Sequence, residues 1–402
     1  MNRLVIACFD AGGGHRSAAL ALAEAIRRQH RAWAVEILNV DEILEPVDPF
    51  YRATGLRGGE VYNWTLRQGW TLASAQVIPI MHGMIRMLHS RQVRLLRDCW
   101  RALRPDLVLS VIPHFNRALY ESLQHEAPRT PFVTLATDLA DYPPHFWFEP
   151  QEQHFICGSE RAAQQAAAVG VGADHVWRVS GMILHPSFYE PIRGDRATER
   201  RKLGLDPKLP TGLILFGGYG SRVMIEIPRL MSTSAKRVQL VFLCGRNHKL
   251  FEKLRSLKLP YPVHIQNFTP HVARFMWLSD FFIGKPGPGS VSEALAMHLP
   301  VIVQDNVATL AQERYNVEWI RQQGVGIPLK RTRDLPRAVS ELLAPRNYHA
   351  MMRRIKALNN RAVFEVPELL DRIYREQSRQ QSQHDEKSPY NEPPQRRIAV
   401  SG

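Results

Sequence analysis

A glycine-rich turn that carries a histidine lies near the start of the chain. Residues 4–9 are apolar and predict a strand, three consecutive glycines that end at Gly14 follow, and residues 17–29 predict a helix just after His15. Glycine lets backbone N–H groups approach a ligand closely, and the N-terminus of the helix behind them favours an anion. Histidine exchanges a proton near neutral pH. The pattern predicts an anion site with a general base at its rim, although many doubly wound domains carry such a turn.

A second glycine-rich loop follows a strand expected at residues 281–283. Glycine recurs at three positions before Ser290, which would cap a helix over residues 291–297, so this loop predicts another anion pocket. Glu293 lies one turn into that helix and would accept hydrogen bonds from two neighbouring hydroxyls, as in a ribose diol. An ordinary first-turn glutamate, favoured there by the helix dipole, gives the same pattern.

A polar trio lies farther along the chain. Gln312, Glu313 and Asn316 would share one face of a helix, because residues three and four apart are neighbours there. Amides and a carboxylate on one face suit a polyol such as a sugar. A solvated helix face shows the same spacing.

Strand-like and helix-like segments alternate around these loops, which predicts βαβ units and parallel sheets. The fold class expected is α/β, with two doubly wound domains that face a cleft and bind ligands at the carboxyl ends of their strands. The expected strands are residues 4–9, 34–40, 107–111, 132–136, 154–157, 212–216, 238–244, 263–266, 281–283 and 300–304. The expected helices include residues 17–29, 90–103, 117–124, 160–169, 291–297 and 348–375.

Shifts in composition divide the chain into domains. Residues 1–185 form the first domain, a proline-rich linker covers 186–210, and residues 211–357 form the second domain. A helix over 358–376 would cross back to the first domain. The polar tail 377–402 is expected to be disordered.

Cysteine usage and hydropathy predict the compartment. The four cysteines lie far apart without a CxxC pair, which argues against a zinc site or a disulfide framework and fits a reducing compartment. The apolar run at residues 4–9 is too short for a signal peptide, and no stretch of about 20 apolar residues would span a bilayer. We expect a cytoplasmic protein, or a peripheral one on the inner face of the cell membrane.

The chain is strongly basic, with a net charge of +14 and a pI near 9.9. An anionic lipid surface or a nucleic acid would be attracted by this charge, and solvated arginines on an ordinary surface would also account for it. No zinc-finger or RNA-binding signature is present, so no nucleic acid partner is expected.

One segment of the first domain suits a lipid surface. Residues 69–85 lack acidic residues, lysine and arginine, contain Trp70 and Ile78, and carry a proline expected to prevent one continuous helix. A basic stripe beside an apolar stripe follows, as at the interface of an anionic membrane. The apolar stripe would equally pack on the sheet, with the arginines solvated. The basic stripe consists of Arg91, Arg94, Arg97, Arg101 and Arg104.

Three of these motifs, in this order, resemble a known family. DAGGGHRSAA from Asp10, GKPGPGSVSEAL from Gly284 and QERYN from Gln312 look like family 28 inverting glycosyltransferases of the GT-B fold. The branch they resemble comprises monogalactosyldiacylglycerol synthases and bacterial processive diacylglycerol glucosyltransferases. The resemblance runs from Leu4 to about Leu370.

The resemblance implies a UDP-sugar donor, held mainly by the second domain, with no metal or other cofactor. His15 would be the base that takes the proton of the acceptor hydroxyl. The glycine loops would meet the diphosphate, Arg246 and Phe268 the uracil, Glu293 the ribose, and Gln312 and Glu313 the hexose. The implied donor-binding residues are Gly14, Gly218, Arg246, Phe268, Gly287, Gly289, Ser290, Glu293, Gln312 and Glu313.

The acceptor implied by the resemblance is a lipid, diacylglycerol or a glycosyl-diacylglycerol. It would lie beside Asp138, a further catalytic candidate, and beside His145 and Trp147. The chain departs from the family on this side, because Ile112 stands where relatives carry histidine and His114 follows two positions later. A UDP-N-acetylglucosamine 2-epimerase, or a transferase with a soluble acceptor, would share the two-domain architecture.

Overall fold

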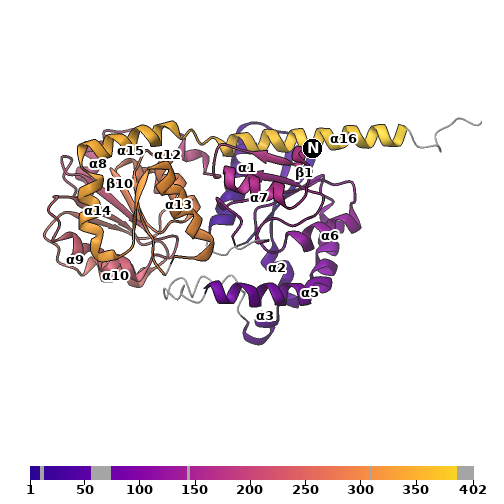
Figure 1. Ribbon diagram of the computed structural model, residues 1–402, viewed down its shortest axis with the longest axis horizontal. Coiled ribbons are helices and arrows are strands. Elements are labelled where there is room, and N and C mark those ends of the chain that lie inside the picture. Colours follow the sequence, from indigo (N-terminus) through magenta and orange to yellow (C-terminus); the bar gives the residue numbers. More distant parts are fainter. Residues whose placement is uncertain (10–12, 56–73, 143–144, 308, 387–402) are drawn as a thin grey trace, which may run out of the picture.

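The chain forms two α/β domains, each built on a parallel sheet of six strands (Figure 1). The computed structural model describes residues 1–9, 13–55, 74–142, 145–307 and 309–386. The two sheets and their covering helices confirm the expected fold class.

The first sheet has the strand order β2-β1-β3-β4-β5-β6. Its strands are β1 (Asn2–Cys8), β2 (Trp33–Asn39), β3 (Leu107–Ser110), β4 (Phe132–Leu135), β5 (His154–Cys157) and β6 (Val176–Arg178). Its helices are α1 (Gly14–Arg28), α2 (Val40–Leu44), α3 (Pro49–Thr54), α5 (Ser74–Leu103), α6 (Asn116–Glu126) and α7 (Glu160–Ala168). The strand β6 was not expected from the sequence.

The second sheet has the strand order β12-β11-β10-β7-β8-β9. Its strands are β7 (Thr211–Leu215), β8 (Gln239–Leu243), β9 (Val263–Gln266), β10 (Phe281–Gly284), β11 (Val301–Gln304) and β12 (Gly326–Leu329). The helices are α8 (Arg196–Lys202), α9 (Ile227–Met231), α10 (His248–Arg255), α11 (Val272–Trp277), α12 (Pro288–Ala296), α13 (Arg314–Gln323), α14 (Leu335–Leu342), α15 (Pro345–Ala357) and α16 (Ala362–Glu386).

Central strands of both sheets are buried on both faces. Every residue of β3, β4, β7, β8 and β10 is buried, which explains why the sequence shows them as unbroken apolar runs. The strand order reverses beside β1 in the first sheet and beside β7 in the second. Ligands of doubly wound folds bind where that reversal opens a crevice at the carboxyl ends of the strands. Gly13 and Gly14 after β1, and the glycine-rich turn after β7, lie at such points.

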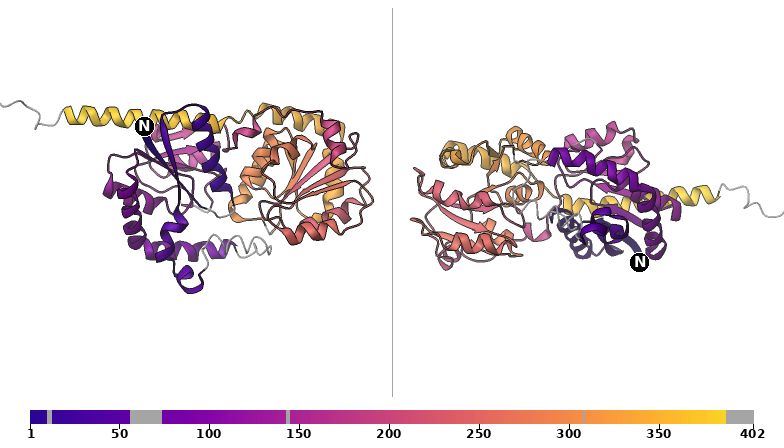
Figure 2. Two further views of the ribbon diagram at one scale, coloured as in Figure 1. Left: turned by 180° about the vertical axis from the view of Figure 1, so that it is seen from behind. Right: turned by 90° about the horizontal axis from the view of Figure 1, so that it is seen from below.

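The last helix ties the two domains together. In Figures 1 and 2, α15 lies on the second domain and α16 runs along the first domain beside α1. Val363, Val366 and Leu370 of α16 are fully buried in the core of the first domain. The helical pattern expected over 348–375 is therefore two helices, and residues 377–386 of the expected disordered tail belong to α16.

The expected linker packs on the second domain. Leu205 and Phe188 join its apolar core, and the buried Arg200 of α8 pairs with Asp280 at 2.7 Å. Asp280 also accepts a hydrogen bond from the backbone N–H of Thr211, at the start of β7. A buried, paired charge holds this segment against the sheet.

The proline of α5 does not interrupt the helix, contrary to the expectation from the sequence. Ser74–Leu103 is one helix of 30 residues that continues through Pro79. Pro79 is the sixth residue of this helix, beyond the first turn, so the helix continues although one backbone N–H that would bond to the carbonyl of residue 75 is missing. Among the described residues, no helix is both long and apolar enough to cross a bilayer.

Candidate active site

His15 lies at the start of α1, where three strands of the first sheet end. Its Nδ1 is 2.9 Å from the backbone oxygen of Val111 and 3.1 Å from Oγ1 of Thr137. A carbonyl only accepts, so Nδ1 carries the proton and Nε2 keeps its lone pair. Burial lowers the pKa of His15 to about 4, and the hydrogen bond to Val111 opposes this shift. The imidazole is therefore a neutral base at physiological pH.

Asp138 and Trp147 lie beside His15. The rings of Trp147 and His15 are 5.8 Å apart, and Trp147 Nε1 donates to Oδ2 of Asp138 at 3.0 Å. Burial raises the pKa of Asp138 to about 7, against the opposing effect of the Trp147 hydrogen bond. The structure thus brings together three of the predicted residues, His15, Asp138 and Trp147.

Asp141 holds the loop that carries Trp147. Its carboxylate accepts the backbone N–H of Trp147 at 2.7 Å and that of His145 at 3.0 Å. Burial raises the pKa of Asp141 to about 6. His145 itself is exposed, with a backbone φ of +62°, and its Nδ1 lies 3.3 Å from the backbone oxygen of Phe148.

A pair of histidines adjoins this cluster and was missed from the sequence. His82 Nε2 of α5 is 2.6 Å from His114 Nδ1, and the His114 ring contacts Phe146 edge to face at 4.1 Å. Burial lowers the pKa of His114 to about 3, with smaller effects from His82 and His15. The two histidines are 32 residues apart in the chain, so no local pattern indicated their contact.

The glycine turn after β7 lies close to the start of the loop after β8. Gly217 has φ +75°, and a Cβ on Gly245 would lie 2.1 Å from the oxygen of Gly218. The backbone N–H of Arg246 donates to that same oxygen at 2.8 Å. The Arg246 guanidinium lies 5.1 Å above the ring of Phe268, which is 54% exposed. A planar, solvent-accessible pair of side chains therefore adjoins the turn.

The second loop differs from its prediction at the start of the helix. α12 begins at Pro288 with Gly287 as its N-cap, so Ser290 is not the cap. Instead, Ser290 Oγ donates to the backbone oxygen of Gly287 at 3.4 Å. The first turn of α12 contains no acidic residue, and Glu293 lies beyond it. The first-turn interpretation of Glu293 is therefore wrong, and burial raises the pKa of its carboxyl to about 7.

The polar trio is not a solvated helix face. Gln312 and Glu313 belong to a 3-10 turn (Ala311–Glu313), and Asn316 lies in α13. Asn316 is fully buried and donates to the backbone oxygen of Pro286 at 2.8 Å, so it holds the glycine loop. Glu313 is buried and pairs with Lys285 Nζ at 2.9 Å.

Lys285 is a further residue that sequence analysis missed, although it lies inside the glycine loop. The charges of Glu313 and Lys285 both act on the pKa of Asp138, the first raising and the second lowering it. Lys285 and Glu313 of the second domain therefore lie close enough to the His15 cluster of the first domain to act on its charges. Among the described residues, no group of three or more histidine, cysteine or acidic side chains is arranged to hold a metal ion.

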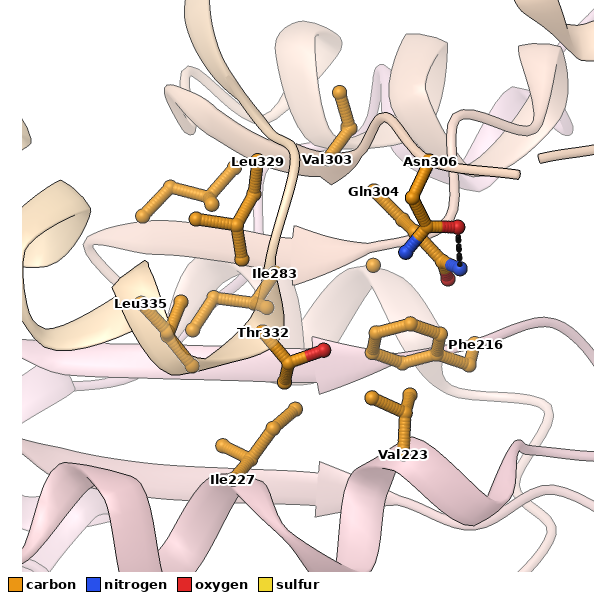
Figure 3. Close-up of a pocket in the computed structure, with 12 residues that line it drawn as sticks. Phe216, Val223, Ile227, Ile283, Val303, Gln304, Asn306, Leu329, Thr332 and Leu335 are labelled. Carbon is orange, nitrogen blue, oxygen red and sulfur yellow. Dashed lines mark hydrogen bonds between the residues drawn. The ribbon is translucent and has the colours of Figure 1, made fainter. Parts of the chain in front are cut away.

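A small pocket inside the second domain is not a candidate for the donor. It lies under the carboxyl ends of the strands, between Phe216, Ile283 and Leu335 (Figure 3). Its accessible space of about 20 Å³ holds about one water molecule. A nucleotide cannot enter it.

The lipid-facing predictions fall on α5 and on the segment before it. Trp70 and the side chain of Ile78 lie outside what the structure describes. The apolar stripe packs inward, because Leu96 and Trp100 are buried in the core of the first domain. Arg97 and Arg101 pair with Glu126 at 2.6 and 2.9 Å. Within the described part of the chain, Arg91 and Arg94 are exposed and form no ion pair.

Comparison with known proteins assigns the chain to a family. The model of the glycosyltransferase family 28 C-terminal domain matches residues 214–373. The probable monogalactosyldiacylglycerol synthase 2 of Oryza sativa subsp. japonica is 30% identical over 358 residues, which cover 84% of this chain and 73% of that protein. The monogalactosyldiacylglycerol synthase of Spinacia oleracea is 27% identical over 401 residues, which cover 93% of this chain and 73% of that protein.

A solved structure supports the same fold. Arabidopsis thaliana UGT89C1, complexed with UDP, superposes with a TM-score of 0.60 at 13% identity, covering 94% of this chain and 100% of that one. Its resemblance extends over both domains. The chain belongs to glycosyltransferase family 28 and is a glycosyltransferase of the GT-B fold.

Proposed function

We propose that this enzyme transfers a hexose from a UDP-sugar to the hydroxyl of diacylglycerol or a glycosyl-diacylglycerol, with inversion, at an anionic membrane surface. The observation that carries the proposal is His15, a neutral histidine whose Nε2 is left as an acceptor by the hydrogen bond from Nδ1 to Val111. Opposite it lie the glycine loops of the second domain. A base and an anion-binding surface on opposite sides of one cleft suit this chemistry.

The transfer needs one proton acceptor and one leaving-group site. His15 Nε2 takes the proton of the acceptor hydroxyl while its oxygen attacks the anomeric carbon, a role that contributes about 10²–10⁴-fold in rate. The bond to the diphosphate breaks on the opposite face, and UDP leaves. Backbone amides of the loops at Gly218 and Gly287 stabilise the charge that develops there. No step requires a metal.

The donor assignment is supported by the shape and polarity of the second domain. Arg246 and Phe268 offer a flat surface for a base, and the carboxyl of Glu293 suits a ribose diol. The solved neighbour that binds UDP shares this fold. Lys285 and Glu313 would lie on the side of the donor site that faces the acceptor.

The acceptor assignment rests on the relatives and on α5. The relatives named above are monogalactosyldiacylglycerol synthases. Met87 is 75% exposed and Met84 37% exposed on the same helix as Arg91 and Arg94. Apolar and basic side chains together suit an anionic bilayer at its interface. We place this surface on the cytoplasmic face of the membrane.

Incubation with labelled nucleotide sugars tests the proposal. The protein is mixed with UDP-glucose, UDP-galactose or UDP-N-acetylglucosamine and vesicles that contain diacylglycerol and an anionic lipid. We expect label in a lipid product with a β-linkage, formed from the α-linked donor. Label only in a water-soluble product, or UDP release that is independent of diacylglycerol, would contradict the lipid acceptor.

A further inference from the structure

Lys285 follows β10 inside the second glycine loop, and its side chain reaches the glycine turn after β7. A Cβ on Gly217 would lie 3.3 Å from Lys285 Cε, and a Cβ on Gly287 would lie 3.5 Å from the same atom. Nζ of Lys285 is 2.9 Å from Oε1 of Glu313. The ammonium group is thus flanked by the same loops that would receive the donor diphosphate.

Two carboxyl groups lie near this lysine before the donor binds. Only 7% of the Glu313 side chain is exposed, and Asp138 is buried on the facing domain. A diphosphate brought near the Glu313 carboxylate without a cation beside it would be repelled, because desolvated like charges are poorly screened. The Lys285 side chain is 30% exposed, so a ligand in the cleft can reach it.

We propose that Lys285 is a catalytic residue of the transfer, whose ammonium moves from Glu313 to the donor diphosphate and stabilises the departing UDP. The inference rests on the proposed UDP-sugar donor. When the bond between the anomeric carbon and the diphosphate oxygen breaks, the electron pair stays on that oxygen and the acceptor proton goes to His15. The leaving group gains one negative charge, so a cation beside it stabilises the transition state more than the ground state.

The movement of the Lys285 ammonium also changes the hydrogen bonding of Glu313. Once it no longer accepts from the ammonium, its carboxylate is available to the hydroxyls of the hexose. One lysine therefore couples the arrival of the diphosphate to the recognition of the sugar. The ammonium would move only a short distance, because Lys285 Cε lies within 4 Å of the Cβ positions built on Gly217 and Gly287.

Calorimetry with UDP and with uridine tests the proposal without any acceptor. In Lys285→Met we expect UDP affinity to fall at least about tenfold and uridine affinity to stay unchanged, since only UDP carries the diphosphate. Lys285→Arg, which keeps the charge, should retain most of the UDP affinity. Turnover of Lys285→Met should fall about 10²-fold or more, as on loss of one charge-stabilising group. UDP affinity of Lys285→Met within twofold of wild type would overturn the proposal.

A double variant separates this role from simple neutralisation of Glu313. If Lys285 only compensates the buried carboxylate, Lys285→Met/Glu313→Gln would bind UDP as tightly as Glu313→Gln alone, and the proposal would be wrong. We expect the double variant to bind UDP at least about tenfold more weakly than Glu313→Gln. Unchanged uridine binding shows that each variant is folded. Because these affinities involve no acceptor, they decide the role of Lys285 even if the enzyme proves to act on a soluble acceptor.

Discussion

At the scale of single residues, the site depends on side chains whose protonation is set by burial. His15 is kept neutral, while Asp138 and Glu293 are protonated more readily than an exposed carboxyl. In each case desolvation disfavours the charged form of the group. At neutral pH the fold therefore holds a neutral imidazole at His15 and two weakly acidic carboxyls, those of Asp138 and Glu293.

Replacement of the base tests its role directly. His15→Ala should lower kcat by at least about 100-fold and leave UDP affinity nearly unchanged, because the base acts on the acceptor proton and not on the donor. Product formation and calorimetry with UDP measure the two effects. A kcat within about threefold of wild type would mean that His15 only closes the turn through Val111.

Glu293 should make UDP binding depend on pH. Its folded pKa of about 7 means that the carboxylate, which accepts more hydrogen bonds from a ribose than the acid does, predominates above pH 7. UDP affinity should therefore fall as the pH is lowered from 8 to 6. Glu293→Ala should weaken binding by about 1.5–3 kcal/mol without unfolding the protein.

A titration of UDP affinity by calorimetry checks this expectation. Glu293→Gln is the matched control, since it keeps the shape of the side chain without the proton. Its UDP affinity should change less over the same pH interval. Equal pH dependence in both proteins would assign the effect to another group, and unchanged affinity in Glu293→Ala would remove Glu293 from the donor site.

At the scale of elements, α5 packs into the core of the first domain and reaches His114. Its buried residues, such as Leu96 and Trp100, fix it to the first domain, and Trp100 Nε1 donates to Ser122 of α6 at 2.7 Å. His82 brings the same helix to His114, next to the cluster of His15, Asp138 and Trp147. Its exposed face carries Met87, Arg91 and Arg94.

The exposed face of α5 should govern binding to vesicles. Replacing Arg91 and Arg94 by Gln should weaken binding to anionic vesicles mainly at low salt, by about 1 kcal/mol for each arginine, because salt screens this attraction. Replacing Met84 and Met87 by Ser should weaken it at every salt concentration, since that contribution is apolar burial. Sedimentation with vesicles at 50 and 500 mM salt measures both.

The matched control for α5 changes the same charge elsewhere. Arg229→Gln/Lys253→Gln removes two exposed cations from the second domain and should leave vesicle binding as in wild type. UDP affinity should survive in all three variants. Equal sedimentation of every variant with anionic vesicles would show that α5 is not the docking surface.

At the scale of the whole molecule, α16 makes the two domains interdependent. It follows α15 of the second domain and buries Leu370 and its neighbours in the core of the first domain. Arg31 and Trp33 of the first domain both bond to Asp371 of this helix, at 2.6 Å each. The segment therefore completes a domain to which it is not adjacent in sequence.

Loss of packing at this helix should destabilise the first domain. Leu370→Ala should lower the free energy of unfolding by about 2–4 kcal/mol, through lost apolar burial and the cavity left behind. Glu368→Ala, an exposed change on the same helix, should alter it by less than about 0.5 kcal/mol. Urea unfolding followed by tryptophan fluorescence measures both. Equal stability of the two variants would show that α16 does not contribute to the core.

The sequence by itself determined the local structure and the motifs. Alternating apolar runs and glycine turns predicted the strands that end beside His15 and Gly218, since strand and turn preferences depend on neighbours along the chain. Ser290 was misplaced as a helix cap because Pro288 begins the helix two residues earlier. Helix boundaries are decided by competition among adjacent residues, which a pattern resolves only approximately.

Only the tertiary structure decided how the chemistry is arranged. His15 meets Thr137 across 122 residues, His82 meets His114 across 32, and Lys285 meets Glu313 across 28. These contacts depend on strand order, which brings the carboxyl ends of β1, β3 and β4 together. Burial then sets the pKa of His15, Asp138 and Glu293, and burial is a property of the packed fold rather than of any segment.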